Sequence, residues 1–287
     1  MEDFSTIIQT SLNTIFSKIF SSLDNSFYYI LDNLAFINPS IIENPIIQKL
    51  LGTDINSGIL AICNSFILGF VIYFSIRYLL SHLIYIKTES PKDFIFKAII
   101  FGTLMNNSLW ICSEIISIVD FCSSFIIYSA ETVSGKTISF SEFINVLNSS
   151  LFWASEANDL FSFAGIVKSF SSIGLINLVF SFALRYIMTI LLILLSPFSF
   201  LCLLSNSTNW IFKSWIKIFI STLLYQLILS LLLTISFSFA SLSTTLVASV
   251  FYIGTIQAFQ KSSYFLKELL GGFTFTTNNH LSSFKSL

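Results

Sequence analysis

A row of polar side chains with the spacing of one helix face lies inside the most apolar stretch of this sequence. Its members are Asn177, Ser181, Arg185 and Thr189. Residues four apart share one side of a helix, and a charge at the centre of a membrane costs roughly 2.5 kcal/mol or more. We therefore expect this face to point away from lipid. It forms either one wall of a hydrated path or a buried contact in which Arg185 pairs with Glu114 or Asp120, or snorkels.

Two further polar rows follow the helical period. One contains Thr103, Asn106, Trp110, Ser113, Ser117, Asp120 and Ser124, with Glu114 in the same stretch, and the other contains Thr222, Gln226, Ser230 and Thr234. Hydroxyl and amide groups in such rows commonly join membrane helices through hydrogen bonds. The three rows predict a bundle or oligomer with a polar interior, and Arg185, Glu114 and Gln226 are its candidate structural or channel residues.

Pro197 interrupts the third apolar stretch, and a cationic, aromatic segment follows it. Proline removes a backbone donor, so it kinks or ends a helix, and the freed carbonyl must be satisfied inside the protein. Beyond the break come Trp210, Lys213, Trp215 and Lys217. Trp favours the headgroup level and Lys extends toward phosphate. The segment is therefore either a membrane-surface anchor or a docking surface for a cytoplasmic partner.

Residue types that carry catalysis or bind metals form no recognisable set in this sequence. The cysteines and histidines are scattered, with no Cys-x-x-Cys pair: Cys63, Cys112, Cys122, Cys202, His82 and His280. Such cysteines are typical of small buried residues. The sequence contains no nucleophile elbow, HExxH motif, phosphate-binding loop or dinucleotide fingerprint. We predict no catalytic residue, no metal and no cofactor, and we do not expect an enzyme.

The elements that must position these residues are membrane helices. Of the 287 residues, 54% are hydrophobic, only 10% are charged and 33 are Phe. Soluble domains carry about 25% charged residues, so a water-exposed surface cannot be built from this inventory. The sequence predicts an all-α fold, a polytopic transmembrane helical bundle of about five spans. The net charge of −1 argues against bulk attraction to nucleic acid.

Three regions are expected along the chain. Residues 1–57 form an amphipathic N-terminal segment with apolar residues at helical spacing, residues 58–260 form the transmembrane bundle, and residues 261–287 form a polar tail. The five expected spans are 58–80, 94–119, 172–195, 218–238 and 241–260. A polar loop over 120–168 contains a short helix near 141–151 that Ser139 or Ser141 caps. The last hairpin is either spanning or re-entrant.

The distribution of Lys and Arg predicts the orientation. The loop 83–97, the connector 205–217 and the tail are rich in Lys for their length, whereas residues 1–57 and the loop 120–168 are acidic. Cytoplasmic loops carry the excess of positive charge. Five spans separate the two sets onto opposite faces. We therefore expect the N-terminal helix and the loop 120–168 outside and the C-terminus in the cytoplasm. The N-terminal helix lies on lipid or docks on another subunit.

Part of the sequence resembles one known family. Between residues 182 and 232, Arg185-Tyr186, a Leu-rich run, Ser196-Pro197-Phe198, Lys213-Ser214-Trp215 with the earlier Trp210, and Gln226 follow one another. This order resembles the core of the TrbL-type polytopic inner-membrane subunit of conjugative type IV secretion systems, whose layout of spans is also similar. In motif the resemblance covers about 50 residues, and the long extra domains of larger members are missing.

The resemblance implies a channel or scaffold subunit of a DNA-transfer machine in the bacterial cytoplasmic membrane. Its expected partners are membrane lipid, other secretion subunits, cytoplasmic ATPases and further copies of itself, with translocated DNA or protein bound only transiently. On this reading Arg185, Pro197, Trp215 and Gln226 match the motif core. The alternative is a small-solute or ion transporter, which one proline break and an odd number of spans disfavour. A membrane-embedded enzyme lacks convergent catalytic groups.

Overall fold

The computed structural model of the chain describes residues 11, 14, 30–52, 58–84, 90–152, 163–240 and 245–269. Every regular element within these residues is a helix, which confirms the predicted all-α class. Residues 30–35 are helical. The later elements are η1 (Pro39–Ile41), α2 (Pro45–Leu51), α3 (Gly58–Ile84), α4 (Pro91–Asn106), α5 (Ser108–Ser134), α6 (Phe140–Phe152), α7 (Phe163–Leu194), α8 (Ser196–Leu201), η2 (Cys202–Leu204), α9 (Asn209–Ala240) and α10 (Thr245–Leu269).

Four of the described helices are long and apolar enough to cross a membrane. The apolar segments are Gly58–Leu83, Ser108–Ser134, Ile173–Leu194 and Asn209–Ser238, in α3, α5, α7 and α9. By length and composition they make this a membrane protein. The first and third predicted spans coincide with the segments in α3 and α7. The predicted fifth span falls mostly in α10, which is not among the four, and residues 241–244 lie outside the described residues.

The second span differs from its prediction, because the helix breaks at Asn107. The expected start at Phe94 falls in α4, whereas the apolar segment is α5. The amides of Asn106 and Asn107 donate to the carbonyls of Gly102 and Thr103, each at 2.9 Å. Asn side chains that bond nearby backbone compete with the helix and have low helix propensity. Two consecutive Asn residues therefore account for the interruption.

Two expected loops are helical in the structure. Helix α5 continues to Ser134, so the loop predicted from Asp120 begins only after that residue. Helix α9 begins at Asn209, so most of the predicted connector 205–217 belongs to the fourth apolar helix. The short helix predicted near 141–151 is α6. Ser139 caps it, because the Glu142 amide donates to the Ser139 hydroxyl at 3.0 Å.

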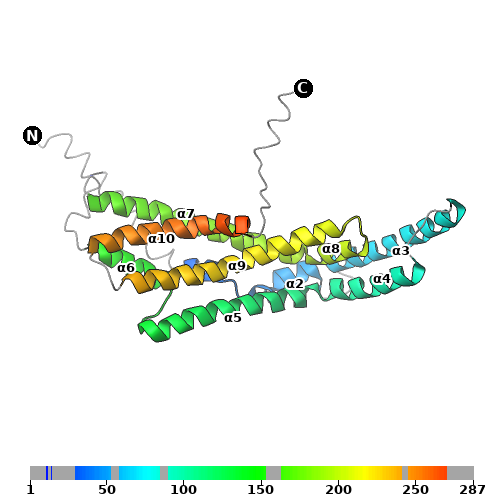
Figure 1. The fold of residues 1–287 in the computed structure, drawn as a ribbon, viewed down its shortest axis with the longest axis horizontal. Helices are drawn as coiled ribbons and strands as arrows, with labels where there is room; N and C mark the ends of the chain where they lie inside the picture. The colour runs from blue at the N-terminus through cyan, green and yellow to red at the C-terminus, as the bar shows by residue number, and fades with distance from the viewer. Residues whose placement is uncertain are drawn as a thin grey trace, which may run out of the picture.

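The helices form an elongated molecule with two unlike ends (Figure 1). Helices α5, α9, α10 and α7 lie side by side in that order, with α6 packed against α10 and α9. We call residues 30–52 together with α5 to α10 the body. Helices α3 and α4 form a hairpin at the opposite end, and α4 leads into α5 in nearly the same direction (Figure 1). We call α3 and α4 the hairpin.

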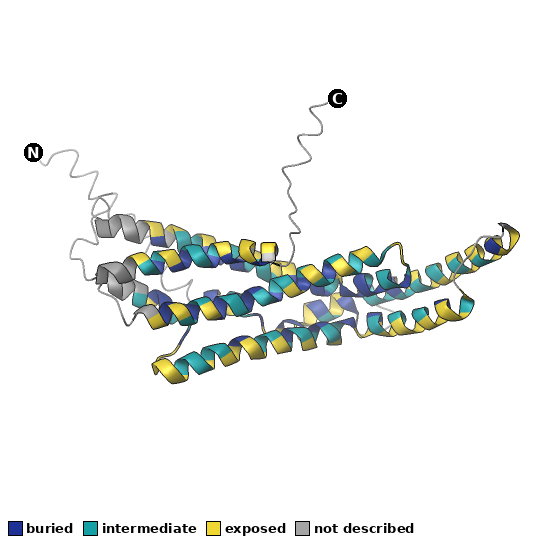
Figure 2. Ribbon diagram, in the orientation of Figure 1, coloured by how far each residue is buried: buried dark blue, intermediate teal, exposed yellow. Residues whose placement is uncertain are grey.

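Apolar side chains pack in two clusters within the body and at the base of the hairpin. The first is centred on Phe140, whose ring contacts Phe182 and Phe259 at centroid distances of 5.4 and 5.1 Å. The second contains Trp215 and Phe219, stacked at 5.3 Å. Figure 2 shows buried residues concentrated in the body, whereas α3 is mostly exposed or intermediate. Within the most apolar stretch of each helix, only 6% of the residues of α3 are buried, compared with 39% in α7 and in α9.

Candidate functional site: a polar clamp on the N-terminal segment

The N-terminal segment enters the body as a series of short, capped turns. The side chain of Asn38 accepts from the Ser40 amide at 3.1 Å and that of Asn44 accepts from the Ile46 amide at 3.0 Å. A proline follows each Asn, at the first position of η1 and of α2, where its missing donor costs nothing. The two Asn-Pro pairs thus start two helical turns.

The segment is part of the folded core in residues 30–52. Leu31, Ala35, Ile37 and Leu51 are each no more than 1% exposed. The predicted lead segment therefore packs, over these residues, against the chain's own helices. Residues 1–29, apart from 11 and 14, lie outside the described residues, so the placement of the predicted N-terminal helix on lipid or on another subunit stays a prediction.

Arg185 on α7 holds the end of the helical turn formed by residues 30–35. Its Nη2 donates to the Leu34 carbonyl at 3.1 Å and also to the Ala35 carbonyl. Carbonyls at a helix C-terminus lack intrahelical partners and carry partial negative charge, so a guanidinium suits them. The expected pairing of Arg185 with Glu114 or Asp120 is wrong, because Glu114 is exposed on α5 and Asp120 contacts Gln226.

The guanidinium of Arg185 is also enclosed by aromatic rings. Its Cζ lies 5.0 Å from the Tyr225 ring centroid and 5.8 Å from that of Phe182. Both distances are in the range of cation–π contacts. The Nε and Nη1 atoms are buried and have no hydrogen-bond partner among the described residues. Among the described residues, the charge is therefore held by two carbonyls and two ring faces and not by an acid.

Gln226 on α9 joins the N-terminal segment to α5. Its Oε1 accepts from the Ile37 amide at 3.0 Å, and its Nε2 donates to the Ser123 hydroxyl at 2.9 Å and to the Asp120 carboxylate at 3.4 Å. The Gln226 side chain is fully buried. A buried amide is stable only when its donors and acceptor are paired. Gln226 therefore fixes α5, α9 and residue 37 relative to one another.

Asp32 completes the contact by capping α6 from outside that helix. Its Oδ1 accepts from the Phe140 amide at 2.7 Å, and its Oδ2 accepts from the Ser141 amide at 3.3 Å and the Ser141 hydroxyl at 2.5 Å. A carboxylate at a helix N-terminus satisfies free amides and opposes the dipole favourably. We call Asp32, Arg185 and Gln226 the clamp, because they bind three positions of one short segment to α6, α7 and α9.

The proline break is closed by side chains in the way the sequence requires. Pro197 cannot donate to the Ile193 carbonyl, and the Ser196 hydroxyl donates to that carbonyl at 2.7 Å. The indole of Trp215 donates to the neighbouring Leu192 carbonyl at 2.9 Å. Trp215 is 5% exposed. Its predicted role in docking a partner is therefore wrong, whereas Trp210, Lys213 and Lys217 are exposed on α9.

The polar rows meet the interior only in part. On α7, Thr189 is buried, Ser181 is half-buried and Asn177 is exposed, and the Thr189 hydroxyl donates to the Arg185 carbonyl of its own helix at 3.0 Å. On α9, Thr222, Ser230 and Thr234 also donate to carbonyls of their own helix. The expectation that these hydroxyls join helices is therefore wrong, and Gln226 makes the crossing contact.

Glu114 lies in an exposed row on the outer face of α5. The row also contains large apolar side chains that are each more than 60% exposed, namely Trp110, Ile118, Phe121, Phe125 and Tyr128. Glu114 itself is exposed. The expectation that this acid lines the interior of the bundle is wrong for the single chain, because the buried face of α5 carries Ser108, Cys112, Ile116 and Ser123 instead.

Asp32 belongs to the clamp, and Ser123 and Tyr225 contact clamp residues, although the sequence did not single out any of the three for a role. No spacing connects residue 32 with residue 140, or residue 123 with residue 226. Of the clamp residues, the sequence identifies only Gln226 and Arg185 as candidates, because they are polar residues inside long apolar runs. Among the described residues no group of His, Cys, Asp and Glu could hold a metal ion.

The clamp holds helices in place. Its hydrogen-bonding atoms contact backbone groups of neighbouring elements or the side chains of Ser141, Ser123 and Asp120. Comparison of the chain with protein-family models, curated proteins and solved structures found no match.

Proposed function

We propose that this chain is a membrane-embedded scaffold or channel subunit of a multi-component secretion machine, of the kind that the TrbL-type proteins of conjugative type IV systems form. In this role it contributes to the passage of DNA or protein across the bacterial cytoplasmic membrane and is not an enzyme. On this proposal the loop after α5 faces outward and the C-terminus faces the cytoplasm, the sides that the Lys distribution predicts.

The exposed position of Glu114 is the observation that carries the proposal. It lies six residues into an apolar helix, and an ionised carboxylate there is costly to place against lipid. Intramembrane acids usually face protein or water. The exposed aromatic residues around it resemble a contact face more than a polar pore lining. We infer that another copy or another membrane subunit covers this face of α5.

The residues of the resemblance support the same role. Arg185, Gln226, Trp215 and the Ser196-Pro197 pair each make a contact that fixes one helix to another or closes a break. They therefore hold the shape of the body. Trp210, Lys213 and Lys217 remain exposed at the start of α9 and form the candidate surface for cytoplasmic partners, including ATPases.

The alternative of a small-solute or ion transporter loses its main candidate residue. A transporter would use the charge in the middle of α7 to bind or relay its substrate. In the structure that charge is committed to the Leu34 and Ala35 carbonyls and to two aromatic rings. A group committed in this way does not exchange partners without moving the N-terminal segment.

The proposal is tested in the bacterium that carries the protein, by deleting the chain and by substituting single residues. We expect deletion to abolish conjugative transfer without affecting growth. Glu114→Leu should lower transfer at least about tenfold, the effect of about 1.4 kcal/mol of lost contact, and should reduce the size of the detergent-extracted complex on a blue-native gel. Glu43→Leu is the matched control, because Glu43 is an exposed acid outside the apolar helices.

Undiminished transfer in the deletion strain would remove the secretion role. A wild-type complex of monomer size, unchanged by Glu114→Leu, would remove the inferred interface. Solute uptake by the purified protein in proteoliposomes would favour the transporter instead.

A further inference from the structure

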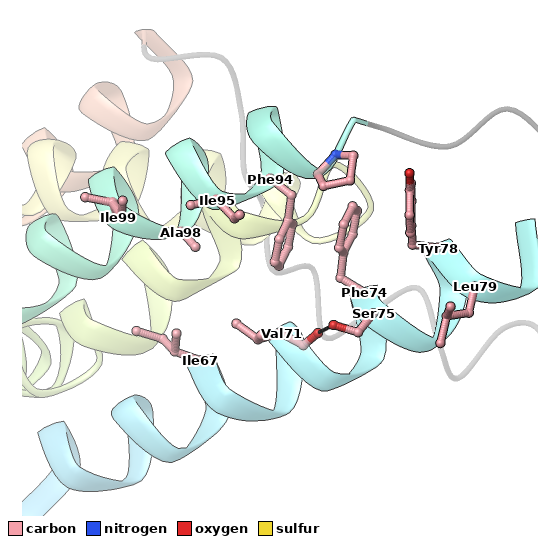
Figure 3. A pocket seen from close by; sticks show the side chains of 11 residues that line it. Ile67, Val71, Phe74, Ser75, Tyr78, Leu79, Phe94, Ile95, Ala98 and Ile99 are labelled. Carbon is pink, nitrogen blue, oxygen red and sulfur yellow. Dashed lines mark hydrogen bonds between the residues drawn. The ribbon is translucent and has the colours of Figure 1, made fainter. Parts of the chain in front are cut away.

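A groove with apolar walls runs between the two helices of the hairpin (Figure 3). Its volume is about 660 Å³, within the range of about 300–1,000 Å³ that small-molecule sites occupy. Phe74 of α3 and Phe94 of α4 stack inside it with centroids 3.9 Å apart. Val71, Ile95 and Ile99 form its walls and are 37%, 57% and 64% exposed. The walls are open to whatever surrounds the hairpin.

Polarity changes along the length of the groove. Ser75 also lines the groove. Its hydroxyl donates to the Val71 carbonyl of its own helix at 2.8 Å, so its donor is already paired within the helix. Tyr78 lies at the end nearest the α3–α4 connection, and Ile67 and Ile99 lie toward the other end (Figure 3). The groove therefore has an apolar length and one polar mouth.

Positively charged and hydrogen-bonding side chains continue the walls past this mouth. His82 follows Tyr78 by one turn, and their rings meet edge-on at 4.9 Å. Lys92 precedes Ile95 and Ile99 by three and seven residues, so it lies above the same side of α4, and it is exposed. The nearby carboxylate of Asp93 accepts from the Ser90 hydroxyl at 2.8 Å as part of the helix cap, and its position on the helix is away from the groove.

The length of the groove corresponds to one leaflet of a bilayer. From Ile67 to Tyr78 it extends for about 16 Å at 1.5 Å per residue, and half of the hydrocarbon core is about 15 Å. Tyr at the mouth and Lys beyond it are the residue types of the headgroup level. An occupant that is apolar over one leaflet and carries an anionic group at its end therefore matches the groove in length, polarity and charge.

We propose that the hairpin groove binds one acyl chain of an anionic phospholipid, with the phosphate at Lys92 and His82. The apolar walls exclude water and take up the chain. Lys92 supplies the charge that distinguishes an anionic from a zwitterionic headgroup, and Tyr78 and His82 offer hydrogen bonds at the glycerol and phosphate level. This site is separate from the exposed face of α5 and does not depend on the secretion role.

The full chain, reconstituted in nanodiscs of equal parts phosphatidylglycerol and phosphatidylcholine and released into detergent, gives the test. Native mass spectrometry measures which lipid stays bound. We expect one retained lipid, with phosphatidylglycerol enriched about fivefold, the effect of one Lys near an anionic headgroup (about 1 kcal/mol). Ala98→Trp fills the groove and should remove the retained lipid. Ile100→Trp, two residues further and on the other side of α4, should leave it in place.

Lys92→Gln separates charge from packing, since Lys92 is exposed and outside the core. It should keep one retained lipid and bring the ratio of the two lipids close to one, whereas Lys136→Gln, at an exposed Lys in the body, should keep the enrichment. A wild-type ratio equal to that of the nanodisc would overturn the proposal. So would retention that survives Ala98→Trp, and if that variant also reduces the native-gel complex, a protein helix occupies the groove.

Discussion

The body and the hairpin satisfy their polar groups in different ways. In the body, the polar groups of Arg185 and Gln226 are enclosed by partners that come from three separate segments of the chain, namely residues 30–52, α5 and α9. In the hairpin, the amides of Asn64 and Asn106 pair reciprocally at 3.3 Å on an exposed surface. Most of the other residues of α3 are apolar and exposed or half-buried. The body thus pairs these two polar side chains within the chain, whereas most of the apolar surface of α3 faces the surroundings of the molecule.

The two regions also differ in position along the molecule. Helices α4 and α5 run nearly in line over residues 91–134 (Figure 1), a length of about 65 Å. The hydrocarbon core of a bilayer is about 30 Å thick. Helix α3 packs beside α4, and α5 continues α4 in nearly the same direction. One hydrocarbon core of this thickness therefore does not enclose both α3 and α5 over their whole length. The break at Asn107 separates the part of this length that belongs to the hairpin from the part that belongs to the body.

The two arginines of the chain give the sharpest test of this comparison. Arg185→Leu leaves the Leu34 and Ala35 carbonyls without their donor, and buried unpaired groups cost about 1–3 kcal/mol each. We expect a loss of about 2–5 kcal/mol in the free energy of unfolding, together with earlier proteolysis of the N-terminal segment. Arg77→Leu, at the exposed arginine of the hairpin, should change unfolding little.

Thermal or denaturant unfolding in detergent micelles measures both variants, and limited proteolysis locates the released segment. Equal destabilisation by the two changes would contradict the distinction between body and hairpin. A large loss in Arg185→Leu without exposure of residues 30–37 would show that the clamp is not what holds this segment.

A smaller effect is expected at the proline break. Trp215→Phe keeps an aromatic ring beside Phe200 and Phe219 but removes the donor to the Leu192 carbonyl. We expect a loss of about 1–3 kcal/mol in the free energy of unfolding, the cost of a buried acceptor left unpaired. Trp210→Phe, at the exposed Trp of the same helix, should be close to neutral. A neutral Trp215→Phe would mean that the break needs no side-chain donor.

Helix type and the positions of two apolar segments, those in α3 and α7, could be predicted because they depend on local composition. The 26 residues of Gly58–Leu83 have a mean hydropathy of 2.2, and such a run has few alternatives to a membrane helix. The helix break at Asn107 could not be placed, since Asn106-Asn107 sits inside an apolar run whose overall pattern continues on both sides. The low helix propensity of two Asn residues does not change the high mean hydropathy of the run that contains them.

The clamp could be predicted only by halves. Arg185 and Gln226 stand out as polar residues in apolar helices, but their partners in the N-terminal segment are backbone groups of residues 34, 35 and 37. Backbone carbonyls leave no trace in a sequence. An acid is the usual partner of a buried arginine, and the predicted span before that of Arg185 contains Glu114 and ends just before Asp120. Which face of α5 turns inward depends on long-range packing that a periodic pattern does not fix.

The smallest expected effect compares two helical glycines, one in each region. A methyl group at Gly174 in α7 would lie 2.9 Å from Cγ2 of Ile256 on α10, whereas at Gly69 in α3 it would meet nothing within 4 Å. Gly69→Ala should raise the free energy of unfolding by up to about 1 kcal/mol through helix propensity alone. At Gly174 the same gain is offset by overpacking, which costs about 1–3 kcal/mol, so Gly174→Ala should be neutral or destabilising. Unfolding of both variants in the same micelles decides the matter. If Gly174→Ala stabilised the protein as much as Gly69→Ala, α7 and α10 would not be in close contact at this point, and the body would be looser than its buried network implies.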